Sequence, residues 1–298
     1  MKVTSKEHAE RLARAERSLG GLSIGDAFGE RFFGPPGTMS ARIAARELPE
    51  GPWRWTDDTA MAVGICEVLR ERGAIEQDRL AEVFARRFYE DRWRGYGPKA
   101  QEILELIYEG TRWQVAARRP YRDGSKGNGG AMRAAPIGGY FADDLERVAA
   151  EARASAEVTH AHPEGQAGAV AVALAAAWAH RDDGTTLFDT VLPRLAPSET
   201  RARVEQAAAM PPTVAVWQVA TRLGAGENVL AEDTVPFALW CASAFIASYE
   251  EALWQTVSAL GDRDTTCAIV GGIVALRSAP PSRWIPLREA LPYSTVEP

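Results

Sequence analysis

The chain has 298 residues, of which 46% are hydrophobic and 25% charged, the composition of an ordinary globular protein. Its net charge of −6 argues against a broad nucleic-acid surface or an anionic membrane surface, although a local basic site for phosphate stays possible. No apolar stretch could span a bilayer, and the N-terminus has no signal-peptide core, so we expect a cytoplasmic protein.

Helical periodicity runs through most of the sequence. The segments predicted as helices cover residues 5–29, 58–73, 78–91, 98–109, 144–157, 165–180, 198–209, 232–247, 249–260 and 265–277. The run over 165–180 is apolar on all sides, which is typical of a helix inside a core. Strand patterns and tandem repeats are missing, and no linker divides the chain. The sequence therefore predicts an all-α fold in a single compact domain over residues 1–298.

Glycine and proline interrupt this pattern at several places. The segment 30–56 holds Gly34-Pro35-Pro36-Gly37 and Gly51-Pro52, which predict breaks between helices. The segment 119–131 reads as a glycine-rich loop that opens a helix at Ala131. Residues 181–198 and those after Ser278 look peripheral. Three widely spaced cysteines in apolar runs indicate buried free thiols, as in a reducing compartment.

Two acidic signatures about two hundred residues apart are the most informative feature of the chain. Thr56-Asp57-Asp58 and Asp262-Arg263-Asp264-Thr265 each provide two carboxylates and a threonine hydroxyl before an apolar helical run. Such oxygen ligands suit Mg²⁺ or Mn²⁺. The alternative is that each Asp caps a helix N-terminus. One cap position needs one carboxylate, and adjacent carboxylates repel, so a two-metal site accounts better for the second member of each pair.

Two further motifs suggest an anion site. Residues 124–130, Gly-Ser-Lys-Gly-Asn-Gly-Gly, could direct backbone N–H groups at a phosphate, or could form a plain surface turn. They match neither the Walker A nor the Rossmann pattern. His160 and His162 lack a third metal ligand nearby, so one imidazole reaching a phosphate or ribose is favoured over zinc, with an ordinary loop histidine as the alternative.

Taken in order, these motifs resemble the ADP-ribosylglycohydrolase family, which includes the enzyme that reactivates dinitrogenase reductase and the crystallin J1 relatives. The matching stretches are Gly25-Asp26-Ala27-Phe28-Gly29, Thr56–Thr59, Gly127–Arg133, Thr159–Pro163 and Gly261–Thr265. The resemblance implies a compact orthogonal helical bundle with a binuclear Mg²⁺ or Mn²⁺ cleft. It assigns as metal ligands Thr56, Asp57, Asp58, Asp262, Asp264 and Thr265. It assigns to substrate binding Gly124, Ser125, Gly127, Asn128, Gly129, Met132 and His160.

The resemblance also implies an activity. The expected reaction is hydrolysis of the glycosidic bond at the anomeric carbon of ADP-ribose, which removes ADP-ribose from a modified macromolecule, with Asp57, Asp58 or Glu30 as proton acceptor. Hydrolysis of a small ADP-ribose-related metabolite and a non-catalytic crystallin-like protein are the alternatives. The expected partner is ADP-ribose or an ADP-ribosylated substrate. The modified residue or base, the choice between the two metals and the oligomeric state stay open, with a monomer expected.

The chain departs from the family pattern at two positions. Phe33 stands where the family commonly has a glutamate near the metals, and Glu30 lies three residues earlier, about one helical turn away. Glu30 could reach the cleft if the helix continues through it; otherwise it is a surface charge. Leu260 stands where the family often has a glycine before Gly261.

Overall fold

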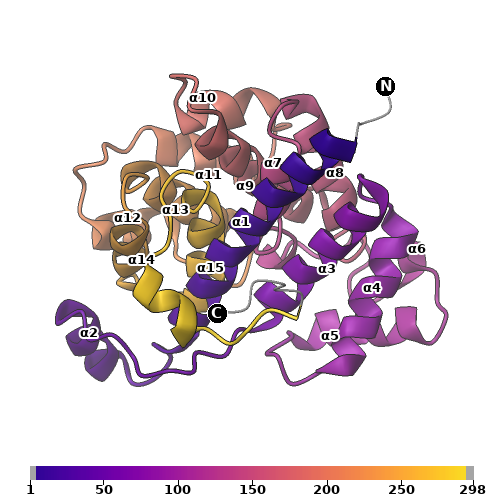
Figure 1. Ribbon diagram of the computed structural model, residues 1–298, viewed down its shortest axis with the longest axis horizontal. Helices are drawn as coiled ribbons and strands as arrows, with labels where there is room; N and C mark the ends of the chain where they lie inside the picture. Colours follow the sequence, from indigo (N-terminus) through magenta and orange to yellow (C-terminus); the bar gives the residue numbers. More distant parts are fainter. Residues whose placement is uncertain (1–4, 293–298) are drawn as a thin grey trace.

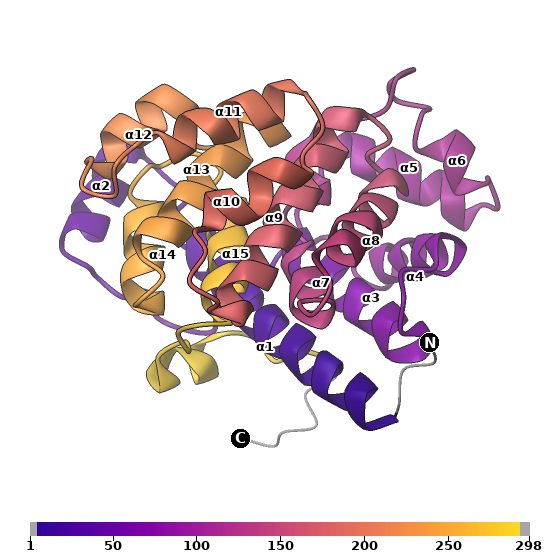
Figure 2. The ribbon, with the colours of Figure 1, turned by 90° about the horizontal axis from the view of Figure 1, so that it is seen from above.

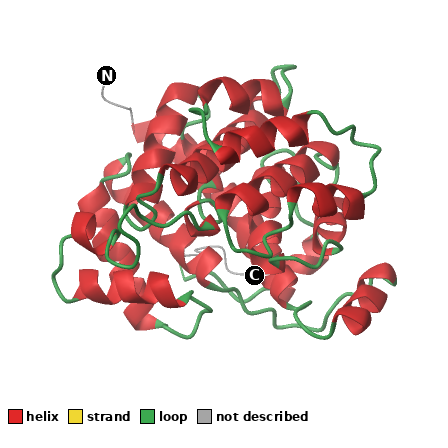
Figure 3. Ribbon diagram, turned by 180° about the vertical axis from the view of Figure 1, so that it is seen from behind, coloured by secondary structure: helices red, strands yellow, loops and turns green. Residues whose placement is uncertain are grey.

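The computed structural model describes residues 5–292, and in that range the chain forms helices and loops without a strand (Figure 3). Two isolated bridges, Trp53 with Arg288 and Gly127 with Leu230, are the extended pairings among these residues. The expected all-α fold is therefore confirmed.

Ten long helices lie close to the predicted ranges. They are α1 (Ser5–Glu30), α3 (Asp57–Arg72), α4 (Gln77–Glu90), α5 (Pro98–Tyr108), α8 (Leu145–Glu157), α9 (Pro163–Arg181), α11 (Glu199–Ala208), α13 (Ala231–Ala244), α14 (Tyr249–Val257) and α15 (Arg263–Val274). As the sequence suggested, α9 is buried along most of its length, and it packs against α7, α8 and α13. The three cysteines are buried and free, as expected.

Several short helices were not predicted. They are α2 (Pro36–Ala44), α6 (Trp113–Ala116), α7 (Ala135–Tyr140), α10 (Leu187–Val191) and α12 (Val216–Leu223), with 3₁₀ turns η1 (Asn128–Gly130), η2 (Leu192–Arg194) and η3 (Ser282–Leu287). Pro36 begins α2 rather than preventing it, because a first-turn proline loses no helical hydrogen bond. The helix after the glycine loop starts at Ala135 and not at Ala131. Pro136 in its first turn fits that start.

Helices α1 and α15 lie side by side in the middle of the molecule (Figures 1 and 2). Glycines at four-residue spacing on α1 let the two backbones touch. A Cβ on Gly25 would lie 2.1 Å from the carbonyl oxygen of Cys267, and one on Gly29 would lie 2.2 Å from that of Arg263. The approach places Asp26, between these glycines, beside the start of α15.

Trp284 belongs to the core, although the stretch after Ser278 was expected to be peripheral; the other described residues of 279–292 are half-buried or exposed. Trp284 in η3 is fully buried, and its ring stacks on Phe28 of α1 with centroids 4.8 Å apart. Trp53 and Trp254 complete an aromatic cluster at the C-terminal end of α1. The burial of Trp284 was not predictable, because one aromatic residue in a short turn has no periodicity.

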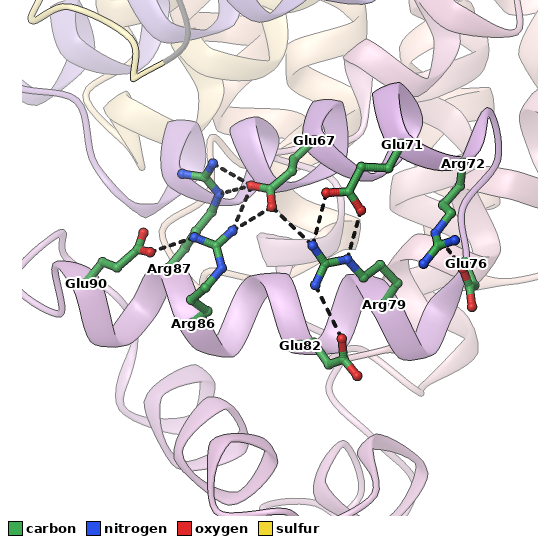
Figure 4. A network of polar contacts seen from close by, with 9 residues as sticks. All are labelled: Glu67, Glu71, Arg72, Glu76, Arg79, Glu82, Arg86, Arg87 and Glu90. Carbon is green, nitrogen blue, oxygen red and sulfur yellow. Dashed lines mark hydrogen bonds and ion pairs between the residues drawn. The ribbon is translucent and has the colours of Figure 1, made fainter.

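A charged network joins α3 to α4 (Figure 4). The buried Glu67 carboxylate accepts hydrogen bonds from Arg86 at 2.6 Å and from Arg87 at 2.7 Å, and Arg79 lies 3.6 Å away. Charge-assisted bonds of this kind are stronger than neutral ones. The network fixes α3, whose first turn carries Asp57 and Asp58. No helix within residues 5–292 is both long and apolar enough to cross a membrane.

Gly25→Ala is expected to lower the free energy of unfolding by several kcal/mol, because the added Cβ meets backbone atoms that have no room to move. Gly20→Ala is the matched control in the same helix. A Cβ there meets no atom within 4 Å, so helix propensity should stabilise this variant by about 0.5–1 kcal/mol. Urea unfolding measures both changes. Equal stability of the two variants would contradict the close α1–α15 contact.

Candidate active site

A cleft of about 1060 Å³ brings together residues from distant parts of the sequence. Its lining includes five of the six predicted metal ligands, Asp57, Asp58, Asp262, Asp264 and Thr265. It also includes all seven residues predicted to bind substrate, Gly124, Ser125, Gly127, Asn128, Gly129, Met132 and His160. The two acidic signatures and the glycine loop therefore face one space.

Asp26 holds the start of α3 in place, a role that the sequence did not reveal. Its fully buried carboxylate accepts hydrogen bonds from the backbone N–H of Thr56 at 2.9 Å and of Thr59 at 3.1 Å. Both threonine hydroxyls donate to it as well, at 2.8 and 2.5 Å. The backbone N–H of Asp57 donates to the carbonyl oxygen of Arg94 at 2.7 Å. Asp57 and Asp58 are thus left free of the capping role.

The second acidic pair does not cap its helix through Asp262 either. Asp262 is the N-cap residue of α15 by position, yet its side chain makes no capping hydrogen bond. It accepts instead from the side-chain amide of Asn128 at 2.7 Å. Asn128 also donates to the Thr234 hydroxyl at 3.1 Å. The helix-capping explanation therefore fails for Asp262, and the carboxylate links α15 to the glycine loop.

The carboxylates raise each other's pKa. Burial raises the pKa of Asp57 to about 7, and the charges of Asp26 and Asp262 add to this effect. Burial, followed by the charge of Asp26, holds the pKa of Asp58 well above its usual range. Burial and the charge of Asp262 do the same to the pKa of Asp264. The cluster has more negative charge than its surroundings balance, which favours a cation between its members.

Two carboxylate oxygens in the cluster have no hydrogen-bond partner among the described residues. They are Oδ1 of Asp58 and Oδ1 of Asp264, and both are buried. A buried acceptor without a partner normally costs about 1–3 kcal/mol, and more for a charged group. Within residues 5–292, no three His, Cys, Asp or Glu side chains already surround a common metal position.

The glycine loop lies against His160 and the segment 228–230. A Cβ on Gly129 would lie 2.8 Å from Cε1 of His160, so the missing side chain leaves that imidazole edge open. Gly124 adopts a left-handed φ of 88°, and a Cβ there would lie 2.4 Å from the backbone nitrogen of His162. Gly127 has a φ of −58°, which any residue can adopt, so glycine is needed there because a side chain would occupy the space beside the loop.

His160 is linked to a buried arginine. Nη2 of Arg133 donates to the Thr159 hydroxyl at 3.0 Å, and that hydroxyl lies 2.8 Å from Nδ1 of His160. A hydroxyl that accepts from Arg133 has its proton available for Nδ1, which places the imidazole proton on Nε2. Burial and then the charge of Arg133 lower the pKa of His160 to about 3, so the ring is neutral at physiological pH. His160 is therefore a neutral donor through Nε2.

Two predicted site residues do not line the cleft. Thr56 is buried behind it, with its hydroxyl 2.9 Å from Oδ2 of Asp58. Glu30 ends α1, so the helix does continue through it, but the residue is solvent-exposed. Partial burial and the charge of Asp26 raise the pKa of Glu30. Phe33 is 47% exposed, and the Arg263 guanidinium lies 4.8 Å from its ring centroid.

Some lining residues carried no usable sequence signal. Residues 228–230 enter the cleft wall through backbone pairing with the glycine loop. Gly95 and Gly97 enter it from the loop before α5, and Pro98 and Lys99 from the first turn of that helix. The position of Asp26 could have been noticed, because it is a charged residue between two glycines in the buried second half of α1. Leu260 adopts a left-handed φ of 63°, a conformation that favours the glycine it replaces.

Comparison with known proteins agrees with the geometry. The ADP-ribosylglycohydrolase family profile matches residues 7–294. An uncharacterized protein of Archaeoglobus fulgidus is 30% identical over 89% of this chain and 88% of its own length, and human ADP-ribosylhydrolase ARH3 is 27% identical over 89% and 85%. A solved structure described as an ADP-ribosylglycohydrolase-related protein complex shares the fold, with a TM-score of 0.66, 24% identity and coverage of 94% of each chain. The chain therefore belongs to the ADP-ribosylglycohydrolase family.

Proposed function

We propose that this chain is one catalytic domain, a metal-dependent hydrolase that removes ADP-ribose from a modified macromolecule by cleaving the glycosidic bond at its anomeric carbon. One observation carries the proposal: two acidic pairs from opposite ends of the chain share a cleft with a glycine loop. The acidic pairs suit hard cations, and the glycine loop suits a diphosphate. Names of relatives agree, since one from Rhodospirillum rubrum is ADP-ribosyl-[dinitrogen reductase] glycohydrolase, 31% identical over half of this chain.

The oxygen donors in the cleft suit the chemistry of two Mg²⁺ or Mn²⁺ ions, which we propose as the cofactors. Five of the six assigned ligands line the cleft, four carboxylates and one hydroxyl, and two buried carboxylate oxygens among them lack a partner. Asp57, Asp58, Asp262, Asp264 and Thr265 would hold the ions. Thr56 lies behind them, with its hydroxyl shared between Asp26 at 2.8 Å and Asp58 at 2.9 Å. Bound ions of this kind neutralise the carboxylates and lower the pKa of bound water.

The glycine loop and His160 would bind the diphosphate and the neighbouring ribose. The backbone N–H of Gly127 donates to the Ser125 hydroxyl, and that of Asn128 donates to the carbonyl oxygen of Val229, both at 3.1 Å. The loop would therefore offer the Ser125 hydroxyl and the backbone at Gly129, where no side chain stands in the way. Nε2 of His160 adds one neutral donor. Asn128 joins the two halves of the site, because its amide contacts Asp262 while its backbone belongs to the loop.

Asp57 is the favoured proton acceptor for the attacking water. It lines the cleft together with the other acidic residues, where substrate and water can reach its carboxylate. Asp58 is its buried neighbour. The carboxylates would also stabilise positive charge that develops on the sugar ring as the glycosidic bond breaks. Glu30, exposed at the end of α1 and outside the cleft lining, is the alternative acceptor.

A small ADP-ribose-related metabolite is the alternative substrate, and a crystallin-like structural role is the alternative without catalysis. The unpartnered buried oxygens of Asp58 and Asp264 argue against the structural role. They cost stability, and only a bound cation or ligand gives them a use. An assay of ADP-ribose release with and without Mg²⁺ separates these alternatives.

Asp262→Ala is expected to abolish activity and to weaken Mn²⁺ binding. Loss of a residue that only contacts a metal ligand costs roughly 10–100-fold in affinity, and loss of Asp262, as a ligand itself, should cost more. Calorimetry measures the affinity, and circular dichroism checks that the helical fold is kept. Asp123→Ala is the matched control, because Asp123 is an exposed carboxylate in the same cleft lining but outside the acidic pairs. Unchanged metal affinity in Asp262→Ala would count against the proposed centre.

Thr159→Val is expected to weaken ADP-ribose binding by about tenfold and to leave Mn²⁺ affinity unchanged, since valine keeps the shape but breaks the link between Arg133 and His160. In a cycle with His160→Ala, the two losses should not add, because both remove the same donor. Full additivity would show that Thr159 acts on something other than His160.

Glu30→Gln tests the alternative acceptor. Because Glu30 is exposed and does not line the cleft, kcat is expected to stay within about twofold, measured as ADP-ribose release at saturating Mg²⁺. A fall of about 10²–10⁴-fold, the usual contribution of a positioned base, would make Glu30 the acceptor in place of Asp57.

A further inference from the structure

A basic segment borders the cleft. Residues 110–130 contain five basic residues, Arg112, Arg118, Arg119, Arg122 and Lys126, and one acidic residue, Asp123. Five positive charges less one negative give this segment a net charge of +4, in a chain whose net charge is −6. The five basic residues are all exposed.

These cations differ from most arginines of the protein in having no carboxylate partner. Arginines elsewhere form the majority of the ion pairs, as in the Glu67 network. Within residues 5–292, none of Arg112, Arg118, Arg119 and Arg122 forms an ion pair, and neither does Lys126. Unpaired like charges in one segment repel each other, and an anion that binds there relieves the repulsion.

Three of the arginines share a hollow outside the cleft. A depression of about 520 Å³ is lined by Gln114, Val115, Arg118, Arg119 and Arg122, without an acidic side chain. Arg122 lines the cleft as well, so the hollow and the candidate active site adjoin at this residue. A substrate that extended from the cleft past Arg122 would lie beside these guanidinium groups.

An aromatic side chain lies among the arginines. Tyr121 is 49% exposed, lines the cleft and stands next to Arg122 in sequence. Cationic grooves with exposed aromatic rings are how proteins bind single-stranded nucleic acid, through phosphate contacts and base stacking. An acidic protein surface could also bind the arginines, but it would not require the exposed ring of Tyr121.

We propose that Arg118, Arg119, Tyr121 and Arg122, called the basic rim, bind the phosphate backbone and one base of a single-stranded nucleic acid. Resting on the proposed function, this makes an ADP-ribosylated nucleic acid the substrate class of the cleft. The rim is local, which is compatible with the acidic charge of the whole chain.

The test is binding of a fluorescent, unmodified 12-nucleotide single strand, followed by anisotropy over a KCl series. The double variant Arg118→Gln/Arg119→Gln should bind the single strand roughly 10–100-fold more weakly at 0.05 M salt. The slope of its plot of log K against log salt should be shallower than that of the wild type by about 1.4, which is about 0.7 for each lost phosphate contact. The matched control is Arg153→Gln/Arg222→Gln, which removes two exposed arginines elsewhere. It should bind like the wild type, as should Asp262→Ala.

Three results would overturn the proposal: an equal loss in the control pair, equally tight binding of a 12-residue polyglutamate peptide, or no binding of the single strand by the wild type. Equally tight binding of a 12-base-pair duplex would overturn the single-strand assignment. Release of ADP-ribose is then compared on a modified strand and a modified peptide, and the rim variant should raise KM for the strand alone. If neither substrate releases ADP-ribose, the proposed function fails, while the anisotropy result still decides the rim.

Discussion

The backbone contact between α1 and α15 is the constraint on which the site depends. Gly25 and Gly29 let the helices approach until an added Cβ would collide with carbonyl groups of α15. At that distance Asp26, on α1, can hold the first turn of α3 while Asp264, on α15, enters the same charge cluster. A larger residue on this face would separate the two acidic pairs. The packing of small residues between α1 and α15 therefore determines whether the carboxylates of both pairs share one cleft.

The site is built at a cost to the folded state. Asp26 is fully hydrogen-bonded, but Asp58 and Asp264 each have a buried oxygen without a partner, and the pKa of each is raised well above its ordinary range. A protein selected only for stability would replace them with apolar or paired residues. The surrounding fold supports them instead, through the Glu67 network on α3 and the aromatic cluster around Trp284. The residues of both supports lie outside the cleft lining.

Sequence patterns predicted the parts of the protein that repeat or cluster. Long helices followed from their periodicity, and the acidic pairs and glycine loop from residue types that few other roles explain. The role of Asp26 escaped because it depends on a helix thirty residues further along the chain. The roles of Trp284 and of residues 228–230 were not predicted, because they depend on contacts with distant parts of the chain that no local pattern reveals. Trp284 is buried in the core, and residues 228–230 line the cleft. For Leu260 the sequence revealed the departure from the family's glycine, but it could not reveal the left-handed φ of 63° that explains why a glycine is usual there.

The distance between the acidic pairs along the chain also has a consequence for biosynthesis. Asp57 and Asp58 leave the ribosome about two hundred residues before Asp262, which at the usual rates of translation is roughly 10–40 s. During that time α1 exposes a glycine face and an aromatic end whose partners, α15 and Trp284, have not been made. The nascent chain therefore cannot form the candidate metal site, and a transcript truncated before α15 would yield a product that is both inactive and prone to capture by chaperones.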